Sequence, residues 1–224
     1  MDDYIQGDIH DVIKSLKSNT IDCIYTNPPF GITENKWDTP LKWNELWNDI
    51  WRVLKPRGVA IIHASMPFSY DLIVSQRPKY HFVWIKDRST NFLNAKKQPL
   101  RKEEEIYIFY KKSPIYNPQM IGDEIIKTSK AGKSKYYGSR SNKKADTFHV
   151  GKYPTNILEY PRNNKQGFKT IPKELVEFLI KSYTNEGDMI LDMTCHSDYV
   201  GKIISKINRN YIGVDINEIV ISKD

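Results

Sequence analysis

Apolar runs alternate with a helical pattern over the first 110 residues of the chain. Short apolar runs at residues 21–25, 59–63, 82–85 and 106–110 have the length and the β-branched or aromatic content of strands. Trp43 to Leu54 spaces its apolar residues as a helix does, and Pro40 and Pro67 stand where helices are expected to begin. Such alternation predicts an α/β fold with a mostly parallel sheet covered by helices.

The same pattern returns towards the end of the chain. It predicts a helix at 172–183, a strand at 189–192, a helix near 200–207 and a strand at 211–215. Between these two parts the pattern is lost in Lys, Ser, Gly, Asn and Tyr. We therefore expect one α/β domain formed by residues 1–110 and 166–224, interrupted by a functional insertion or mobile lobe at 111–165.

Charge is concentrated in this lobe. The 224 residues carry a formal net charge of +7, whereas residues 111–165 alone hold twelve Lys or Arg and four acids, a surplus of eight positive charges. Aromatic residues are interleaved with the cations, namely Tyr136, Tyr137, Phe148 and Tyr153. This mixture can neutralise phosphates and stack on bases, which favours a nucleic acid as partner. A solvated basic loop would have the same composition.

The two cysteines and the first residues indicate the compartment. Cys23 and Cys195 lie outside any disulfide or zinc-ligand spacing and are expected to be buried thiols. The start, Met1-Asp2-Asp3-Tyr4, has no signal-peptide pattern, and no stretch approaches 18 apolar residues. These observations predict a soluble cytoplasmic protein with no metal site and no membrane partner.

Asn27-Pro28-Pro29-Phe30 follow directly on the predicted strand 21–25. They therefore lie at the carboxyl end of a strand, where open α/β sheets bind their ligands. The Asn27 side-chain oxygen and the Pro28 carbonyl can accept the two hydrogens of an exocyclic amine, which directs the nitrogen lone pair towards a methyl donor. Phe30 can stack on an extruded base, and Pro28 and Pro29 stiffen the loop. A Pro-Pro turn that only ends a strand is the alternative.

These residues and several later segments resemble one enzyme family. Asn27-Pro28-Pro29-Phe30 resembles motif IV of the amino-methyltransferases, (D/N/S)PP(Y/F), and the similarity extends through Gly31-Ile32 to Lys36-Trp37-Asp38. It continues at residues 91–95, 98–101, 109–112 and 116–119, and resumes at 172–192 and 208–213. With the target-amine motif ahead of the cofactor turn, the order is similar to that of the permuted β class of S-adenosylmethionine-dependent DNA amino-methyltransferases, of the phage and bacterial adenine-N6 type.

The resemblance implies a Rossmann-like methyltransferase fold, in which a mostly parallel twisted sheet has helices on both faces and the basic insertion recognises the target. It also implies S-adenosylmethionine as cofactor, with Asp8, Asp192 and Asp215 as the cofactor-binding residues: Asp215 on the ribose hydroxyls, Asp8 near the adenine and Asp192 directly before a Gly-rich turn. In this chain His196 and Asp198 stand at the glycine positions of that turn. A β-carbon there restricts the backbone and fills the space of the ligand, so weak or absent cofactor binding is expected.

Double-stranded DNA is the partner that the resemblance implies, with a homodimer or heteromer possible. We expect DNA contacts from two groups of cations: Arg88, Lys96, Lys97, Arg101 and Lys102 in one segment, and Lys133, Lys135, Arg140, Lys143 and Lys144 in the lobe.

Two hypotheses follow. One is a DNA adenine-N6 methyltransferase; the other is a catalytically inactive methyltransferase-like DNA-binding or regulatory protein, or an inactive subunit of a heteromeric enzyme. A methyltransferase acting on RNA or protein would share Asn-Pro-Pro-Phe, but the long similarity to DNA enzymes argues against it.

Overall fold

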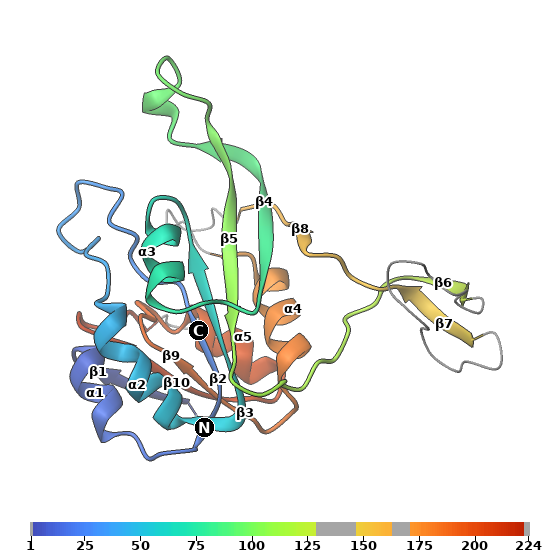
Figure 1. The fold of residues 1–224 in the computed structure, drawn as a ribbon, viewed down its shortest axis with the longest axis horizontal. Coiled ribbons are helices and arrows are strands. Elements are labelled where there is room, and N and C mark those ends of the chain that lie inside the picture. Colours follow the sequence, from blue (N-terminus) through green and yellow to red (C-terminus); the bar gives the residue numbers. More distant parts are fainter. Residues whose placement is uncertain (1, 129–146, 163–170, 222–224) are drawn as a thin grey trace. The chain divides into compact units, whose positions relative to one another are not determined.

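One mixed sheet organises the larger part of the molecule (Figure 1). The structure is a computed structural model that describes residues 2–128, 147–162 and 171–221. In the described residues this sheet has eight strands, which lie side by side in the order β1 (Asp2–Gln6), β10 (Asn210–Asp215), β9 (Met189–Asp192), β2 (Ile21–Thr26), β3 (Leu54–Ala64), β5 (Arg101–Phe109), β4 (Tyr80–Thr90) and β8 (Ile157–Glu159). The first five strands are mutually parallel, β5 is antiparallel to both its neighbours, and β8 is parallel to β4.

Helices cover both faces of this sheet, and each face has its own apolar core. On one face α1 (Ile9–Ser15), α2 (Trp43–Val53) and α3 (Phe68–Ser75) pack around Ile24 and Ile62. On the other face α4 (Lys173–Tyr183) and α5 (Tyr199–Lys206) pack around Tyr25 and Ile61. Because neighbouring strand residues point to opposite faces, a strand buried on both sides has an unbroken apolar run. The fold class predicted from the sequence is confirmed.

Several helices and strands have other bounds than the apolar pattern predicts, and some were not predicted. Beyond Ile85 and before Glu104, β4 and β5 form a polar, largely exposed hairpin stem that no apolar pattern marks. β1 is a short, polar edge strand, paired with β10 only, and sequence analysis missed it together with α1. α3 begins directly after Pro67, whereas α2 begins at Trp43 with Lys42 rather than Pro40 next to it.

The described residues fall into two compact units, one within residues 1–117 and 156–224 and the other within 118–155. The second unit contains the antiparallel strands β6 (Ile121–Thr128) and β7 (Thr147–Lys152), most of whose side chains are exposed. Asn117 belongs to the first unit, where its N–H donates to the Ser182 carbonyl at 2.8 Å. The basic lobe expected over 111–165 therefore contains the second unit and short flanks of the first, and its functional boundary stays a prediction.

Both cysteines are buried, as expected from the sequence, with Cys23 fully enclosed and Cys195 nearly so. Across the described ranges, no helix combines the length and the apolar character that crossing a membrane requires.

Gly201 is where α5 lies closest to the sheet. A β-carbon at this position would lie 2.8 Å from the Tyr211 ring and would also meet the Tyr4 hydroxyl. Because Tyr211 is fully buried, its ring has little room to move. We expect Gly201→Ala to lower the free energy of unfolding in urea by about 1–3 kcal/mol through overpacking.

Lys206→Ala is the control for this substitution, because Lys206 is exposed on the same helix. It should change the free energy of unfolding by no more than about 0.5 kcal/mol. Equal stability of the Gly201→Ala variant and the unchanged protein would contradict this account of how α5 packs.

Candidate active site

Polar side chains gather at one edge of the sheet, where the parallel strands end. Asp8 follows β1, Asp215 ends β10, Asp192 ends β9, and Asn27 follows β2. Since parallel strands place their carboxyl ends together, all four residues lie at the same edge. A hydrogen bond of 2.8 Å between the hydroxyls of Thr26 and Thr194 joins the end of β2 to the turn after β9.

The two proposed amine acceptors, the Asn27 side chain and the Pro28 carbonyl, have no hydrogen-bond partner among the described residues, but they differ in exposure, because Asn27 is exposed whereas Pro28 is buried. Phe30, expected to stack on a base, is half-buried and stacks on Phe68, with ring centroids 5.3 Å apart and 24° between the planes. One face of Phe30 is therefore covered by the core, so stacking on a base is left to its other face. Pro29 is half-buried beside it.

A single carboxylate holds the loop that follows this motif. Asp38 accepts the N–H groups of Gly31 and Ile32 at 2.9 Å, and both the N–H and the hydroxyl of Thr33 at 2.8 Å. Burial acts to raise the pKa of Asp38, but these hydrogen bonds outweigh it and hold the pKa below its ordinary value. The ionised carboxylate thus fixes the chain just beyond Phe30, a role that was not predicted from the sequence.

Asp192 lies beneath the site rather than open to it. One carboxyl oxygen accepts the Thr194 N–H at 3.1 Å and the other accepts the Tyr211 hydroxyl at 3.2 Å, and the residue is only 3% exposed. Burial is the main cause that raises the pKa of Asp192, from 3.8 to about 7. The contacts show Asp192 fastening the turn after β9 to β10.

The turn after β9 keeps a conformation that suits glycine. His196 has a φ of 57°, in the left-handed region, and its side chain is exposed. Its N–H donates to the Asp215 carboxylate at 2.9 Å. Asp198 differs: its φ of −74° requires no glycine, and it is buried and paired with Lys202 at 3.2 Å. The sequence argument about glycine therefore applies to the backbone at 196 and not at 198.

Backbone from near the end of the described chain pairs with this turn. The Val220 N–H donates to the His196 carbonyl, and the Asp198 N–H donates to the Val220 carbonyl, both at 3.1 Å. Ser197 and Val220 thereby form a parallel bridge. The turn is thus held on one side by Asp215 and on the other by Val220.

Asp8 and Asp215 stand next to each other, because the N–H of Gly7 donates to the Asp215 carbonyl at 2.8 Å. The Asp8 carboxylate caps α1 by accepting the His10 N–H at 2.9 Å, and this bond is the main cause of its lowered pKa. In the described part of the chain only Oδ1 of Asp8 has a hydrogen-bond partner, so Oδ2 remains an acceptor.

The donors and acceptors at this end of the edge fit a nucleoside. Nε2 of His10 is buried and has no partner among the described residues, which leaves a polar atom close to Asp8. Carboxylates on two adjacent strands can accept from ribose hydroxyls and an exocyclic amine. The chain therefore fits the adenosine half of S-adenosylmethionine.

A buried polar chain, missed by sequence analysis, lies below Asn27. Tyr25 hydrogen bonds to His63 at 3.1 Å, His63 to Glu104 at 2.8 Å, and Lys86 to Glu104 at 2.8 Å. Burial acts to raise the pKa of Glu104, but the bond from His63 and the charge of Lys86 hold it below its ordinary value. These hydrogen bonds link β2, β3, β5 and β4 and so fix the strand that directly precedes Asn27.

Some of the residues predicted to contact DNA lie in the described part of the chain and the others lie outside it. Arg88, Lys96, Lys97 and Lys102 are exposed on the hairpin formed by β4 and β5. Arg101 is half-buried and donates to the Ser65 hydroxyl at 2.9 Å, so it also braces the hairpin against the end of β3. The remaining predicted residues lie outside the described residues, namely Lys133, Lys135, Arg140, Lys143 and Lys144.

Comparison with known proteins identifies the class. The profile of the N6/N4 DNA methylase family matches residues 21–222, so this chain belongs to that family. It is 28% identical over 233 residues to the DNA adenine methyltransferase YhdJ of Escherichia coli, covering 95% of this chain and 78% of that protein. It is 26% identical over 226 residues to the type II methyltransferase M.HpaI of Haemophilus parainfluenzae, covering 92% and 67% respectively.

Solved structures support the fold. The cytosine-N4-specific PvuII DNA methyltransferase superposes with a TM-score of 0.67 at 14% identity, over 96% of this chain and 82% of that one. M1.HpyAVI in complex with S-adenosylmethionine superposes with a TM-score of 0.62 at 19% identity, over 97% and 95%. The methyltransferase fold implied by the resemblance is thereby confirmed.

The raised pKa of Asp192 makes a prediction about pH. A carboxyl that holds its proton more tightly when folded stabilises the fold fully below its unfolded pKa, near 4, and loses this contribution as the pH rises to about 7. Asp192→Asn cannot titrate, and its amide can still accept from Thr194 and donate to Tyr211. Relative to the unchanged protein, the variant should therefore gain stability between pH 5 and 7 and gain no more above it.

Urea unfolding of both proteins from pH 5 to pH 8 measures the difference between their free energies of unfolding. The titration of all other groups contributes equally to both proteins and so cancels. A difference in free energy that does not vary with pH would show that Asp192 is ionised throughout the range.

Proposed function

We propose that this chain methylates the exocyclic amine of adenine in double-stranded DNA, with S-adenosylmethionine as the methyl donor. The observation that carries this proposal is a pair of acceptors with no hydrogen-bond partner among the described residues, the Asn27 side chain and the Pro28 carbonyl, at the sheet edge that also holds Asp8 and Asp215. The choice of adenine is supported by the similarity to a DNA adenine methyltransferase. The position of β2 before β9 in the chain is consistent with the permuted class.

The chain's own groups account for orientation of the amine. The lone pair of an exocyclic amine is delocalised into the base, and the base must leave the duplex stack to be reached. Asn27 and Pro28 each accept one amine hydrogen, which favours a pyramidal nitrogen whose lone pair is directed away from the ring. Asp38 holds the loop beyond Phe30 so that both acceptors keep their positions.

S-adenosylmethionine, when bound, supplies an electrophilic methyl group. Asp215 would hold its ribose hydroxyls and Asp8 its adenine, while the turn around His196 would lie beside its methionine part. Contact with DNA would come from Arg88, Lys96 and Lys97 on the hairpin and from the basic lobe at 111–165, where target recognition is placed by the resemblance.

The proposal is tested by incubating the protein with unmethylated plasmid DNA and S-adenosylmethionine and measuring the methylated nucleosides by mass spectrometry. N6-methyl-2′-deoxyadenosine should form, and Asn27→Ala should lower its rate of formation by about 100-fold or more, as the loss of one transition-state contact does. Binding of duplex DNA should be unchanged in this variant.

Asn48→Ala is the matched control, because Asn48 is exposed on α2 and belongs to no described contact of the site. N4-methylcytosine as the product would contradict the assignment of adenine. The absence of any methylated base would favour the second candidate below.

A catalytically inactive DNA-binding relative, or an inactive subunit of a heteromeric enzyme, is that second candidate. It is favoured by His196, whose exposed imidazole occupies a glycine position of the cofactor turn in a left-handed conformation. An imidazole there takes space that the methionine part of the cofactor needs. The two candidates therefore differ in what His196 does to cofactor affinity.

His196→Gly separates these effects. Removing the left-handed strain should raise the free energy of unfolding by about 1 kcal/mol, and removing the imidazole should lower the Kd for S-adenosylmethionine in calorimetry by about tenfold, or ~1.4 kcal/mol. Asp198 is left in place because it is buried and paired with Lys202.

Asn208→Gly is the control, since Asn208 is exposed and also has a positive φ, of 62°, but lies in the turn between α5 and β10. It should leave cofactor affinity unchanged. If His196→Gly gains stability without any gain in affinity, the imidazole does not limit cofactor binding.

A further inference from the structure

The tip of the hairpin formed by β4 and β5 exposes two large apolar side chains. Phe92 is 75% exposed and Leu93 is 82% exposed, in the 3-10 turn η1 (Phe92–Asn94). Among the described residues these are two of the most exposed large hydrophobic side chains. Neighbouring apolar residues that water surrounds so fully are unfavourable in isolation and indicate a binding surface.

The tip is a structured turn. Asn91 has a φ of 63°, its carbonyl accepts the Asn94 N–H at 3.0 Å, and its side chain accepts from the Asn94 amide at 2.6 Å. The turn continues with the N–H of Lys97 bonded to the Asn94 carbonyl at 2.8 Å. These bonds hold Phe92 and Leu93 outward, so the two side chains are presented at little further entropic cost on binding.

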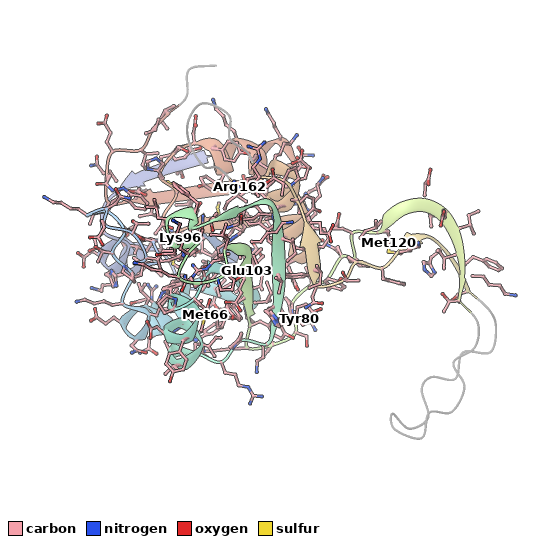
Figure 2. All side chains as sticks on the ribbon, turned by 90° about the horizontal axis from the view of Figure 1, so that it is seen from above. Met66, Tyr80, Lys96, Glu103, Met120 and Arg162 are labelled. Carbon is pink, nitrogen blue, oxygen red and sulfur yellow. The ribbon has the colours of Figure 1, made fainter. Side chains whose placement is uncertain are left out.

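Strand direction places this tip on the side of the sheet where Asn27 lies. β4 is antiparallel to β5, and β5 is antiparallel to β3, so β4 ends at the same edge as β3 and β2. In Figure 1 the hairpin extends well beyond the rest of the sheet, and in Figure 2, seen from above, Lys96 near the tip and Glu103 in the stem lie close together in projection. The two views agree that the hairpin stands up from this edge.

The hairpin is long enough to enter a DNA groove. Across the sheet, Thr26 pairs with Ile62, Ile62 with Tyr107, and Tyr107 with His81. His81 of β4 is therefore level with Thr26, the last residue of β2. Pairing with β8 ends at Ile85, and β4 runs five residues further, to Thr90, which at ~3.3 Å per strand residue is at most about 16 Å, against the ~8.5 Å depth of the major groove. The stem ends at the pair of Thr90 and Arg101, beyond a bulge.

The charges around the tip select the partner. Residues 88–102 contain five Lys or Arg and neither Asp nor Glu. An apolar pair flanked on both sides by cations is unsuited to an apolar protein surface, because the cations would lose their hydration, whereas a duplex offers phosphates outside and apolar base faces inside. Double-stranded DNA satisfies both parts of the tip.

We infer that Phe92 and Leu93 act as a wedge that enters the base stack of double-stranded DNA beside the target base. The inference rests on the proposed function, because it explains how a base reaches Asn27: it must be unstacked, which costs a few kcal/mol per step in general. Stacking of the Phe92 ring on the bases that remain offsets part of that cost. Arg88, Lys96 and Lys97 contact the flanking phosphates and position the wedge.

Unwinding of a closed circular plasmid tests this inference without knowledge of the target sequence. Side chains inserted between base pairs unwind the helix, so a plasmid relaxed by topoisomerase I with the protein bound should change its linking number. The double variant Phe92→Ala/Leu93→Ala should lose most of this change, at least about fivefold per bound protein. Its affinity for duplex in a gel-retardation assay at low salt should fall no more than about threefold, because the phosphate contacts remain.

Three further variants make the result specific. Phe92→Trp/Leu93→Met keeps apolar bulk and should retain the unwinding. Val74→Ala, at an exposed apolar residue of α3, should change neither quantity. Lys96→Ala/Lys97→Ala should weaken binding and its salt dependence while leaving the unwinding per bound protein in place.

The possible failures are distinguishable. If the unchanged protein binds duplex DNA but does not unwind it, or if Phe92→Ala/Leu93→Ala unwinds it equally, the wedge is wrong and the proposed function stands. If the unchanged protein retards no duplex at low salt, the proposed function fails and the wedge with it. If the double variant changes the oligomeric state in sedimentation and not the unwinding, the tip is a contact between two copies of this chain.

Discussion

The parallel pairing of β9 with β2 is the interaction on which the site depends. These strands come from opposite ends of the chain, and the ladder aligns Cys23 with Ile190 and Ile24 with Leu191. Because the pairing is parallel, the loop that begins at Asn27 and the turn that begins after Asp192 leave the sheet at the same edge. The hydrogen bond between Thr26 and Thr194 completes this join. An antiparallel pairing would have separated Asn27 from the turn after β9 by the length of a strand.

The fold could be predicted from the sequence where strands are buried on both faces. Residues 21–25, 59–63 and 189–192 are mostly apolar on both faces, with one polar residue in each run, because helices cover both sides of the central sheet. β1 and the stem of the β4–β5 hairpin have no such signal, since one is a polar edge strand and the other extends beyond the core. Pattern follows burial, and the elements that lie outside the core leave no comparable pattern.

The site was predicted in the same uneven way. Asn27 and Asp215 could be placed because each ends or directly follows a strand, and strand ends are visible in the sequence. The buried chain from Tyr25 through His63 to Glu104 could not, because its members are 38 and 41 positions apart and meet only through the pairing of β2, β3 and β5. Asp38 was similarly hidden, since its role depends on backbone N–H groups that any residue provides. Residues that act at a strand end can be predicted from a sequence, whereas contacts between residues far apart in the chain cannot.

The parallel bridge between Ser197 and Val220 couples the turn after β9 to the segment that contains Val220, so that local unfolding of one involves the other. The His196 carbonyl and the Asp198 N–H are both bonded to Val220, so separation of this one residue breaks both bonds together, while Asp215 still holds the His196 N–H. Segments that open as one cooperative unit exchange their amide hydrogens with a common free energy. A ligand bound at the turn would slow hydrogen exchange at the Val220 amide. The exchange rate of this amide, which lies outside the turn, would therefore report on ligand binding at the turn.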